Sequence, residues 1–263
     1  TLTLTTFAEE NAVNVDTLSK DVSTDDLLEM DLSQLLEVEV VTASKKAQNI
    51  KLAPADMIVI SEKQIKERGY KDLKDIFKDL PGFDISENVE GEIRTIVTGR
   101  GLVGNNKIMV LLDGKKLNTT TGERFVYGNN IPLFNIKQIE IIYGPSSAMY
   151  GADAYAGVIN MISKTPEEIN GFATDFFYDS NQTFNESIVL GKKVNDSFSI
   201  ILDARRYDSG GVDVTNFSEY KTDGYKAIND DFIQPTHNYN IYTKVKLNDF
   251  TLGYYRMDAN EPN

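Results

Sequence analysis

The chain contains no cysteine and only one histidine, His237, among its 263 residues. Without cysteine it has neither disulfides nor thiolate metal ligands, and a single histidine excludes a multi-histidine metal or haem site. It also lacks any run approaching the roughly 18 consecutive apolar residues that a membrane-spanning helix needs. A closed β-barrel is therefore the one way left for this chain to cross a bilayer.

Basic residues are scarce relative to acidic ones. Lys and Arg number 27 and Asp and Glu number 40, which gives a net charge of -13 and a pI of about 4.6. Binding a phosphate backbone requires clustered Lys and Arg, so this balance argues against nucleic acid as a partner. The charge is compatible with a soluble acidic domain and with the polar lumen of a barrel.

The sequence offers no group of catalytic residues. No Ser-His-Asp or Glu-x-x-His arrangement forms around His237, so we predict no enzymatic activity and no cofactor. Residues 99–104 match the G-x-G-x-x-G pattern of dinucleotide sites, but Asn105 and Asn106 lead into another strand instead of a helix. Because no helix N-terminus would face a pyrophosphate, this motif predicts no nucleotide site.

Composition and periodicity divide the chain into four parts. Residues 1–36 form an acidic extension, in which Thr6-Phe7-Ala8 is typical of the end of a secretory signal and, equally, of a frayed polar tail. The other parts are a short β-prone segment with a polar linker (37–48), a compact mixed α/β domain (49–164) and strands alone (165–263). The strand pattern runs on to the last residue without a closing element, so we expect the sheet to be incomplete.

Local signals define the elements of the compact domain. Ser61 and Gln64 form a capping box at the start of a helix that Gly69 ends, and a second amphipathic helix stops at Pro81-Gly82. Asp113-Gly114 predicts a hairpin turn. Strands are expected at 57–60, 95–98, 108–112, 115–118, 138–143 and 157–162.

Beyond Lys164, apolar and polar residues alternate. Phe198, Ile200 and Leu202 share one face of a strand, opposite Ser199 and Arg205. A soluble half-buried sheet and a membrane barrel both produce this period of two. Strand length, aromatic residues near the strand ends and the order of the links favour a barrel. The links at 193–196 and 248–249 are short and predicted to be periplasmic, and the longest link, 208–238, is predicted to lie outside.

Four segments in order carry a family resemblance. They are LKDIFKDLPGFDI (73–85), TGRG (98–101), MVLLDGKKL (109–117) and IEIIYGPSSAMYG (139–151). Together they resemble the plug of TonB-dependent outer-membrane receptors, and residues 165–263 resemble the first strands of the barrel. The implied fold is an α+β plug, a small mixed sheet with short helices, followed by the N-terminal antiparallel strands of a transmembrane β-barrel of about 22 strands.

One position departs from the family pattern. The family usually has arginine where Tyr143 precedes Gly-Pro. In the family, arginines of the plug pair with glutamates of the barrel and help to hold the plug in place. The resemblance therefore implies that Arg100 holds the plug in the barrel by such an ion pair, and we call it the plug–barrel latch.

The resemblance also implies a mechanism and partners. Such a receptor lies in the outer-membrane lipid of a Gram-negative cell, and TonB, with its ExbB/ExbD complex, energises uptake by adding a strand to a short extended segment. The residues in that place are Val38, Glu39, Val40, Val41, Thr42 and Ala43. The first strand of the plug itself is the alternative interpretation of these residues.

Ligand binding is expected at the plug loops that face outside. The candidate residues are Glu87, Asn88, Glu90, Glu92, Arg124, Phe125, Tyr127 and Asn129. A cation beside two aromatic rings fits a ferric siderophore, whereas packing of the same rings against the barrel wall needs no ligand. Cobalamin, haem and other metal chelates are alternative ligands. A non-energised surface or periplasmic β protein with a plug-like domain is the alternative from another class.

Overall fold

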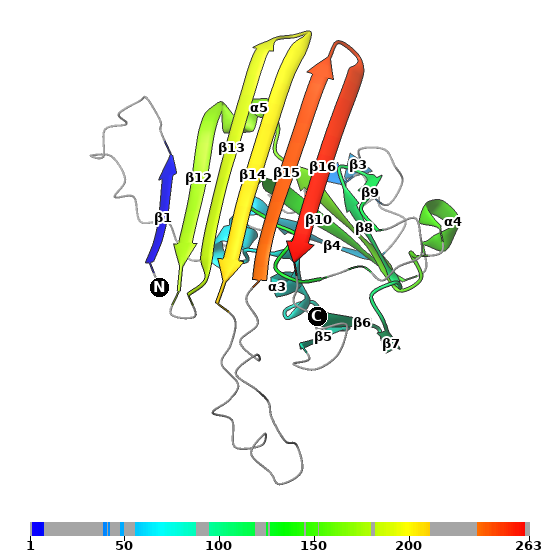
Figure 1. Ribbon diagram of the computed structural model, residues 1–263. Coiled ribbons are helices and arrows are strands. Elements are labelled where there is room, and N and C mark those ends of the chain that lie inside the picture. The colour runs from blue at the N-terminus through cyan, green and yellow to red at the C-terminus, as the bar shows by residue number, and fades with distance from the viewer. Residues whose placement is uncertain are drawn as a thin grey trace, which may run out of the picture.

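The computed structural model describes residues 2–7, 39–40, 42, 48–49, 56–87, 95–118, 125, 127–144, 146–151, 153–179, 182–210 and 236–260. These residues form two main parts. One is a mixed α/β body that we call the plug unit (residues 56–164), and the other is a long antiparallel sheet that stands against it (Figure 1).

The plug unit is built on a five-stranded sheet. Its order is β4 (Met57–Ser61), β10 (Ile136–Tyr143), β11 (Gly157–Ser163), β8 (Ile108–Leu112) and β9 (Lys115–Lys116). Strands β8 and β11 are parallel, and the other neighbours are antiparallel. A smaller sheet joins β5 (Phe83–Glu87), β6 (Thr95–Gly99) and β7 (Leu102–Val103), and β2 (Glu39–Val40) pairs with β3 (Gln48–Asn49).

Helices cover the two faces of the five-stranded sheet. The main core lies under α2 (Glu62–Glu67) and α3 (Leu73–Phe77), where Ile65 and Phe77 belong to the same buried cluster as Ile139 and Ile159. On the other face, α4 (Ser147–Tyr150) places Tyr150 against Ile142 and Val158. A last short helix, α5 (Pro166–Ile169), connects the plug unit to the long sheet.

Most of the predicted elements of the plug unit are confirmed. Gln64 N donates to Ser61 Oγ at 3.3 Å and Ser61 N donates to Gln64 Oε1 at 2.9 Å, which is the predicted capping box. The turn at Asp113 and Gly114 has φ values of 48° and 74°. The strand predicted at 115–118 is shorter, because the side chain of Asn118 bonds Val110 N and Ile108 O in place of a backbone ladder. Helix α5 was not predicted.

The long sheet is antiparallel throughout. Its order is β1 (Leu2–Phe7), β12 (Gly171–Tyr178), β13 (Phe184–Asn195), β14 (Phe198–Ser209), β15 (Thr236–Leu247) and β16 (Phe250–Asn260). The short links β13–β14 and β15–β16 lie at one end, and β14 ends and β15 begins at the other end (Figure 1). The predicted order of short and long links is confirmed.

Strand β1 lies in the part predicted as a signal remnant with an acidic extension. Leu2 pairs with Tyr178 and Phe7 with Ala173, so the segment occupies the free edge of β12. Its alternating Leu and Thr residues suit a strand. The sequence alone did not predict this pairing, because a six-residue strand forms only where the fold supplies an unpaired edge.

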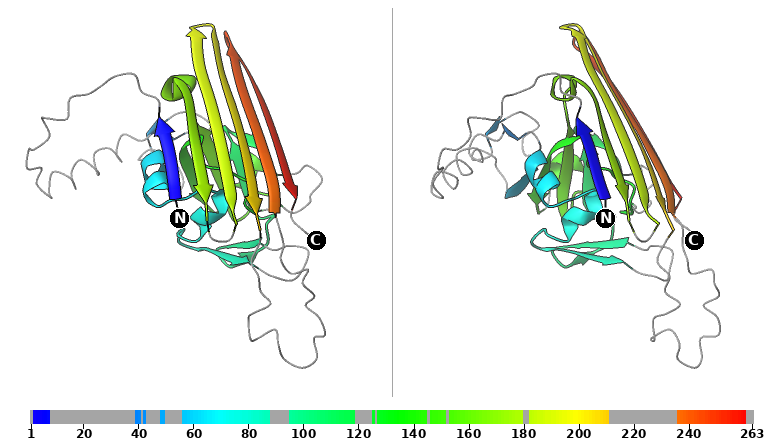
Figure 2. Two further views of the ribbon diagram at one scale, coloured as in Figure 1. Left: turned by 60° about the vertical axis from the view of Figure 1, so that its left-hand side comes forward. Right: turned by 90° about the vertical axis from the view of Figure 1, so that its left-hand side faces the viewer.

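The long sheet is inverted relative to a soluble sheet. Most of its buried side chains against the plug unit are polar, although the apolar Ala173, Val189 and Ile201 are buried among them. The polar ones are Asp175, Asn185, Ser187, Ser199, Arg205, Asn238 and Asn240. Its outward face carries apolar side chains, of which Ile188, Leu190, Leu202 and Ile241 are each 41–42% exposed. Figure 2 shows the plug unit against one face of the sheet, with the other face bare. A soluble half-buried sheet would hide its apolar face, so the structure removes that alternative.

No helix among the described residues combines the length and the apolarity that crossing a membrane requires.

Gly157 offers a test of this packing. A Cβ at this position would stand 2.6 Å from the carbonyl oxygen of Ile142 in the neighbouring strand. The backbone of a paired strand cannot move away without breaking hydrogen bonds, so we expect Gly157→Ala to lower the free energy of unfolding by about 1–3 kcal/mol. A lower apparent melting temperature in detergent measures this loss. Gly253→Ala in β16 is the matched control, because nothing lies within 4 Å of its added Cβ. Equal melting temperatures for the two variants would contradict the close pairing of β10 with β11.

Candidate functional site

A buried ion pair joins the plug unit to the long sheet. Asp72, at the start of α3, lies 3.0 Å from the guanidinium of Arg205 on β14, and each side chain is 2% exposed. The same carboxylate oxygen accepts a bond from Ile131 N at 2.9 Å. The pair therefore joins a helix, a loop and a strand at one point.

Polar side chains of the long sheet also bind the plug backbone next to this pair. Arg205 donates to the carbonyl of Asn129 at 3.1 Å, and Asn238 donates to the same oxygen at 3.1 Å. Asn240 donates to the carbonyl of Asn130 at 2.6 Å. Strands β14 and β15 thus hold the loop that precedes β10 by its main chain. Such contacts fix the position of the loop without depending on its side chains.

The burial of the Asp72–Arg205 pair shifts the pKa of Asp72. Removal from water raises the pKa of Asp72 to about 7, although the charge of Arg205 acts in the opposite direction. A carboxylate in this position depends on its partner to stay ionised near neutral pH. Lys71 extends the network, since its ammonium lies 3.1 Å from Asp175 on β12.

A second contact is centred on the turn residue Asp113. Its carboxylate lies 2.7 Å from the ammonium of Lys244 and accepts bonds from Tyr242 and Ser163, each at 2.7 Å. Burial opposes ionisation of Asp113, but Lys244 and these hydrogen bonds outweigh it, so the pKa of Asp113 is lowered. The Asp-Gly turn predicted from the sequence therefore also anchors β15.

The segment predicted to bind TonB lies on the plug unit. Val40 is fully buried, and it pairs with Gln48. Thr42 is 1% exposed, and its backbone N donates to Glu140 at 2.7 Å. Its hydroxyl donates to Glu140 and accepts from Asn160 at 2.9 Å, and its carbonyl accepts from Tyr150 at 2.7 Å. Glu39 forms part of β2, whereas Val38, Val41 and Ala43 lie outside the described residues.

The predicted ligand residues do not come together as one described site. Phe125 and Tyr127 are 4% and 1% exposed and stack on each other, and Tyr127 also packs on Phe77. Both rings are core residues, so the expectation that they face a ligand is corrected. Asn129 contributes its carbonyl to the contact with Arg205, and Glu87 ends β5. The other candidates, Asn88, Glu90, Glu92 and Arg124, lie outside the described residues.

Arg100 and Tyr143 take no part in the contacts around Asp72 and Asp113. Arg100 sits at the turn between β6 and β7, with φ of 52°, and no described carboxylate pairs with it. Its role as a latch remains a prediction. Tyr143 packs on Phe83 with ring centroids 5.6 Å apart, and its buried hydroxyl has no hydrogen-bond partner among the described residues. At position 143 this chain therefore makes an aromatic contact, whereas the family usually has a charged arginine there.

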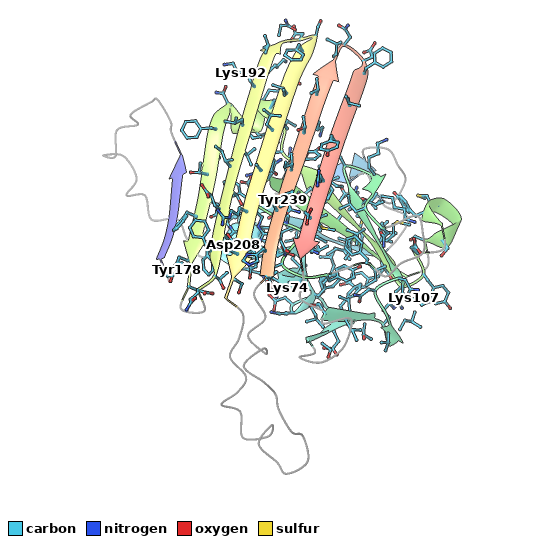
Figure 3. The ribbon with its side chains drawn as sticks, in the orientation of Figure 1. Lys74, Lys107, Tyr178, Lys192, Asp208 and Tyr239 are labelled. Carbon is cyan, nitrogen blue, oxygen red and sulfur yellow. The ribbon has the colours of Figure 1, made fainter. Side chains whose placement is uncertain are left out.

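Sequence reasoning missed the residues that hold the two parts together. Arg205 and Lys244 were assigned to the polar faces of their strands, but their partners Asp72 and Asp113 lie more than 130 positions away. Figure 3 shows side chains along strands β12–β16 of the long sheet, with Lys192 near the end of the short links and Tyr178 and Asp208 near the other end. A basic residue within a polar strand face is the signal that could have prompted a search for an acidic partner.

Comparisons with known proteins agree with this arrangement. The family model of the TonB-dependent Receptor Plug Domain matches residues 49–158. The vitamin B12 transporter BtuB of Vibrio vulnificus is 36% identical over 138 residues, which are 52% of this chain and 22% of the transporter. An iron-regulated outer membrane virulence protein of Vibrio cholerae is 36% identical over 144 residues, with the same two coverages. The chain thus spans about a fifth of the length of these relatives, 22% in each case.

Solved structures extend the likeness to the fold of the strands. The ferric-catecholate import receptor Fiu of E. coli K12 superposes with a TM-score of 0.58 at 22% identity, over 80% of this chain and 28% of Fiu. The ferripyoverdine receptor of Pseudomonas aeruginosa gives 0.64 at 15% identity, over 84% of this chain and 27% of the receptor. At these identities the likeness concerns the fold.

Both the plug unit and the strands beside it therefore have counterparts in these receptors. Residues 49–158 match the TonB-dependent receptor plug domain, and through this region the chain is similar to TonB-dependent receptors.

Proposed function

We propose that this protein is an outer-membrane receptor for the energised uptake of a scarce ligand, and that the ligand is a ferric siderophore. The observation that carries the proposal is the inverted long sheet, which buries polar side chains against a plug domain and exposes apolar ones. An apolar outer face with a polar inner face is the pattern of a transmembrane barrel. Lipid covers the outer face, and the plug fills the lumen.

The sheet continues into a closed barrel in the whole protein. Among the described strands, β16 pairs only with β15, so its other edge would leave backbone groups unpaired in lipid. Unpaired groups in hydrocarbon cost several kcal/mol each, which closure of the barrel avoids. About 22 strands make a barrel wide enough to hold a plug. An apolar outer face also argues against the alternative of a soluble surface or periplasmic β protein.

Energy for uptake comes from TonB and its ExbB/ExbD complex. The outer membrane has no useful ion gradient and the periplasm no ATP, so a partner in the inner membrane must drive the plug. Residues 38–43 are the segment that pairs with TonB by strand addition. The hydrogen bonds that Thr42 makes with Glu140, Asn160 and Tyr150 support this role. They hold the segment by separate polar contacts, which can break one after another.

The relatives support a ferric siderophore as the ligand, and cobalamin, haem and other metal chelates are the alternatives. Fiu and the ferripyoverdine receptor, which share the fold, are named for ferric ligands, and the Vibrio cholerae relative is named as iron-regulated. BtuB, which is 36% identical in the matched region, is named for vitamin B12. Cobalamin is therefore the second candidate. Uptake of radiolabelled ferric siderophores and of radiolabelled cobalamin by cells with and without the gene separates the two.

Energy coupling can be tested at Val40. Val40→Pro removes a backbone donor from the strand that TonB is proposed to extend, so we expect uptake to be abolished while ligand binding to the cells persists. Val40→Ala, which keeps the N–H group, is the control and should retain uptake. Normal uptake by the proline variant would exclude this segment as the coupling site, and passive uptake in cells without TonB would exclude energised transport.

Docking of the segment can be tested at Thr42. Thr42→Val removes the hydroxyl that bonds Glu140 and Asn160 but keeps the side-chain shape and the backbone. The loss of these bonds should favour the undocked segment by about 1–2 kcal/mol and raise capture by the C-terminal domain of TonB roughly tenfold in a pulldown. Thr98→Val in β6 is the control. Unchanged capture by Thr42→Val would show that the hydroxyl does not hold the segment.

The buried pair predicts a pH dependence. Asp72 ionises near 3.8 in the unfolded chain and at about 7 in the folded protein, so its burial penalty is absent below the lower value and complete above the higher one. Arg205→Met removes the group that lowers this pKa, so we expect a loss of about 3–5 kcal/mol near pH 8 and a much smaller loss near pH 5. Chemical denaturation at both pH values measures it.

Arg206→Met supplies the control for this experiment. Arg206 is the next residue of β14, points outward and pairs with Asp208, and its side chain is 68% exposed. Its replacement should cost little at either pH, because exposed ion pairs contribute little to stability. A loss for Arg205→Met that does not change between the two pH values would contradict the role given to Asp72.

A further inference from the structure

The outward face of the long sheet changes from apolar to charged at one row of side chains. Strand register places five outward residues in a line across β12–β16: Phe176, Glu186, Arg206, Tyr239 and Asp258. We call this line the outer row, because it lies toward the end of the sheet that carries Asp208, opposite the end near Lys192 (Figure 3). One row further out, Asp208 lies beside His237, whose side chain is 59% exposed. The outer row is therefore a border between two kinds of surface.

On the other side of the outer row, the outward side chains are mostly apolar. Those that are 41% exposed or more include Ile188, Leu190, Leu202, Ile241, Leu247, Phe250 and Leu252. From Arg206 to Phe198, β14 spans about 27 Å at about 3.4 Å per residue, which a strand tilt of about 40° reduces to about 21 Å. This height is close to the apolar band of about 25 Å on membrane barrels. Lys192 also lies on this face, near the short links, where its long stem lets the ammonium reach the opposite surface of the membrane.

The side chain of Arg256 turns away from the apolar band. Arg256 pairs with Ile241 in the strand register, one row inside the band. Its Nη2 atom nevertheless donates to the hydroxyl of Tyr239 at 3.1 Å and lies 3.7 Å from Asp258, and both of these residues belong to the outer row. Cationic side chains bend in this way where apolar surface meets a polar phase. The direction of Arg256 thus marks the outer row as the polar edge of the band.

Aromatic side chains lie at both edges of the band. At the outer row, Phe176 packs edge-to-face on Phe184 with ring centroids 5.0 Å apart. At the opposite edge, Phe198 and Phe250 lie on one row, because both pair with Leu247 in the strand register. Membrane barrels carry aromatic girdles at the two lipid–water interfaces. The rings therefore place the outer interface where the charged side chains place it.

We propose that the outer row lies at the level of the lipid phosphate groups in the outer leaflet, and that Arg206 and Arg256 bind these phosphates. This inference rests on the proposed barrel and adds the lipid groups that its outer end contacts. A guanidinium matches the oxygens of a phosphate with paired N–H donors. Arg206 contacts Asp208 through Nε and Arg256 contacts Tyr239 through Nη2, and neither uses all five of its donors on the described residues.

Two carboxylates beside the arginines determine the kind of contact. Asp208 lies 2.6 Å from Nε of Arg206, and Asp258 lies 3.7 Å from Nη2 of Arg256. Because these acids offset the positive charge, the outer row does not attract phosphate by net charge. The contact depends on the hydrogen-bonding geometry of each guanidinium, and the acids hold the arginines in position. Lysine, which has the same charge but no fork of donors, is therefore the informative replacement.

Spin labels along β13 test the level of the membrane. No native cysteine among the 263 residues competes with an introduced one. Glu186→Cys, Ile188→Cys and Leu190→Cys place a nitroxide at successive outward positions of the full-length protein in its native membrane. Collisions of the label with a water-soluble nickel chelate, and with oxygen, which concentrates in hydrocarbon, report its depth. We expect the ratio of oxygen to nickel collisions to rise several-fold from position 186 to position 188, and again at position 190.

The outcomes separate this inference from the proposed barrel. Oxygen collisions that already dominate at position 186, or nickel collisions that still dominate at 188 but not at 190, would move the boundary off the outer row. Either result would overturn the inference while the barrel stands. Few collisions of either kind at 188 and 190 would show that protein covers this face, which would also overturn it. Frequent nickel collisions at all three positions would put the whole face in water and contradict the barrel as well.

Magnetic-resonance contact between arginine carbon and lipid phosphorus tests the binding of phosphate. The full-length protein, labelled with ¹³C at its guanidinium carbons, is placed in vesicles of outer-membrane lipid, and dephasing of the ¹³C signal by lipid ³¹P is measured. Arg206→Lys and Arg256→Lys should each remove part of the dephased signal. Arg68→Lys is the matched control and should remove none, because Arg68 lies on the plug unit and its side chain is 55% exposed, as is that of Arg256. A dephased signal that either of the first two variants leaves intact would overturn the proposal, and so would an equal loss in Arg68→Lys.

Discussion

The structure depends on the requirement that buried polar groups find partners. The long sheet turns its polar face toward the plug unit, so each side chain there must bond to the plug, to a neighbouring strand or to water. Arg205 meets Asp72, Lys244 meets Asp113, and Asn240 meets the carbonyl of Asn130. Neither part would be stable with its facing surface left in this state alone. The plug and the sheet therefore specify each other.

The contacts at this junction differ in how easily they separate. The Asp72 pair is almost fully buried, and this burial raises the pKa of Asp72 to about 7, although the charge of Arg205 favours the ionised carboxylate. The Asp113 contact is partly exposed. These polar contacts, together with buried apolar side chains such as Val189 and Ile201, hold the plug unit against the long sheet. A dry apolar junction would hold it more permanently, because its area would have to be exposed to water all at once.

The N-terminal segment around Thr42 is also held by polar contacts, at the other face of the plug. Glu140 and Asn160 are buried in the middle of strands β10 and β11, where an apolar pair would be expected. Thr42 supplies hydrogen bonds to both. The segment is thus held by polar bonds that are specific in geometry and modest in strength.

The sequence by itself determined the local elements and the class of protein. Capping residues at Ser61 and Gln64, the Asp113-Gly114 turn and the alternation after Lys164 each act over a few residues, so they could be read directly. The ordered motifs gave the resemblance to TonB-dependent receptors. Tertiary structure alone decided that Phe125 and Tyr127 are core residues, that β1 adds to the edge of β12, and that Asp72 pairs with Arg205. It also decided which face of the strands is buried. Period-two alternation shows that the two faces differ, but only the position of the plug shows that the polar one is inside, because that choice depends on contacts between residues more than a hundred positions apart.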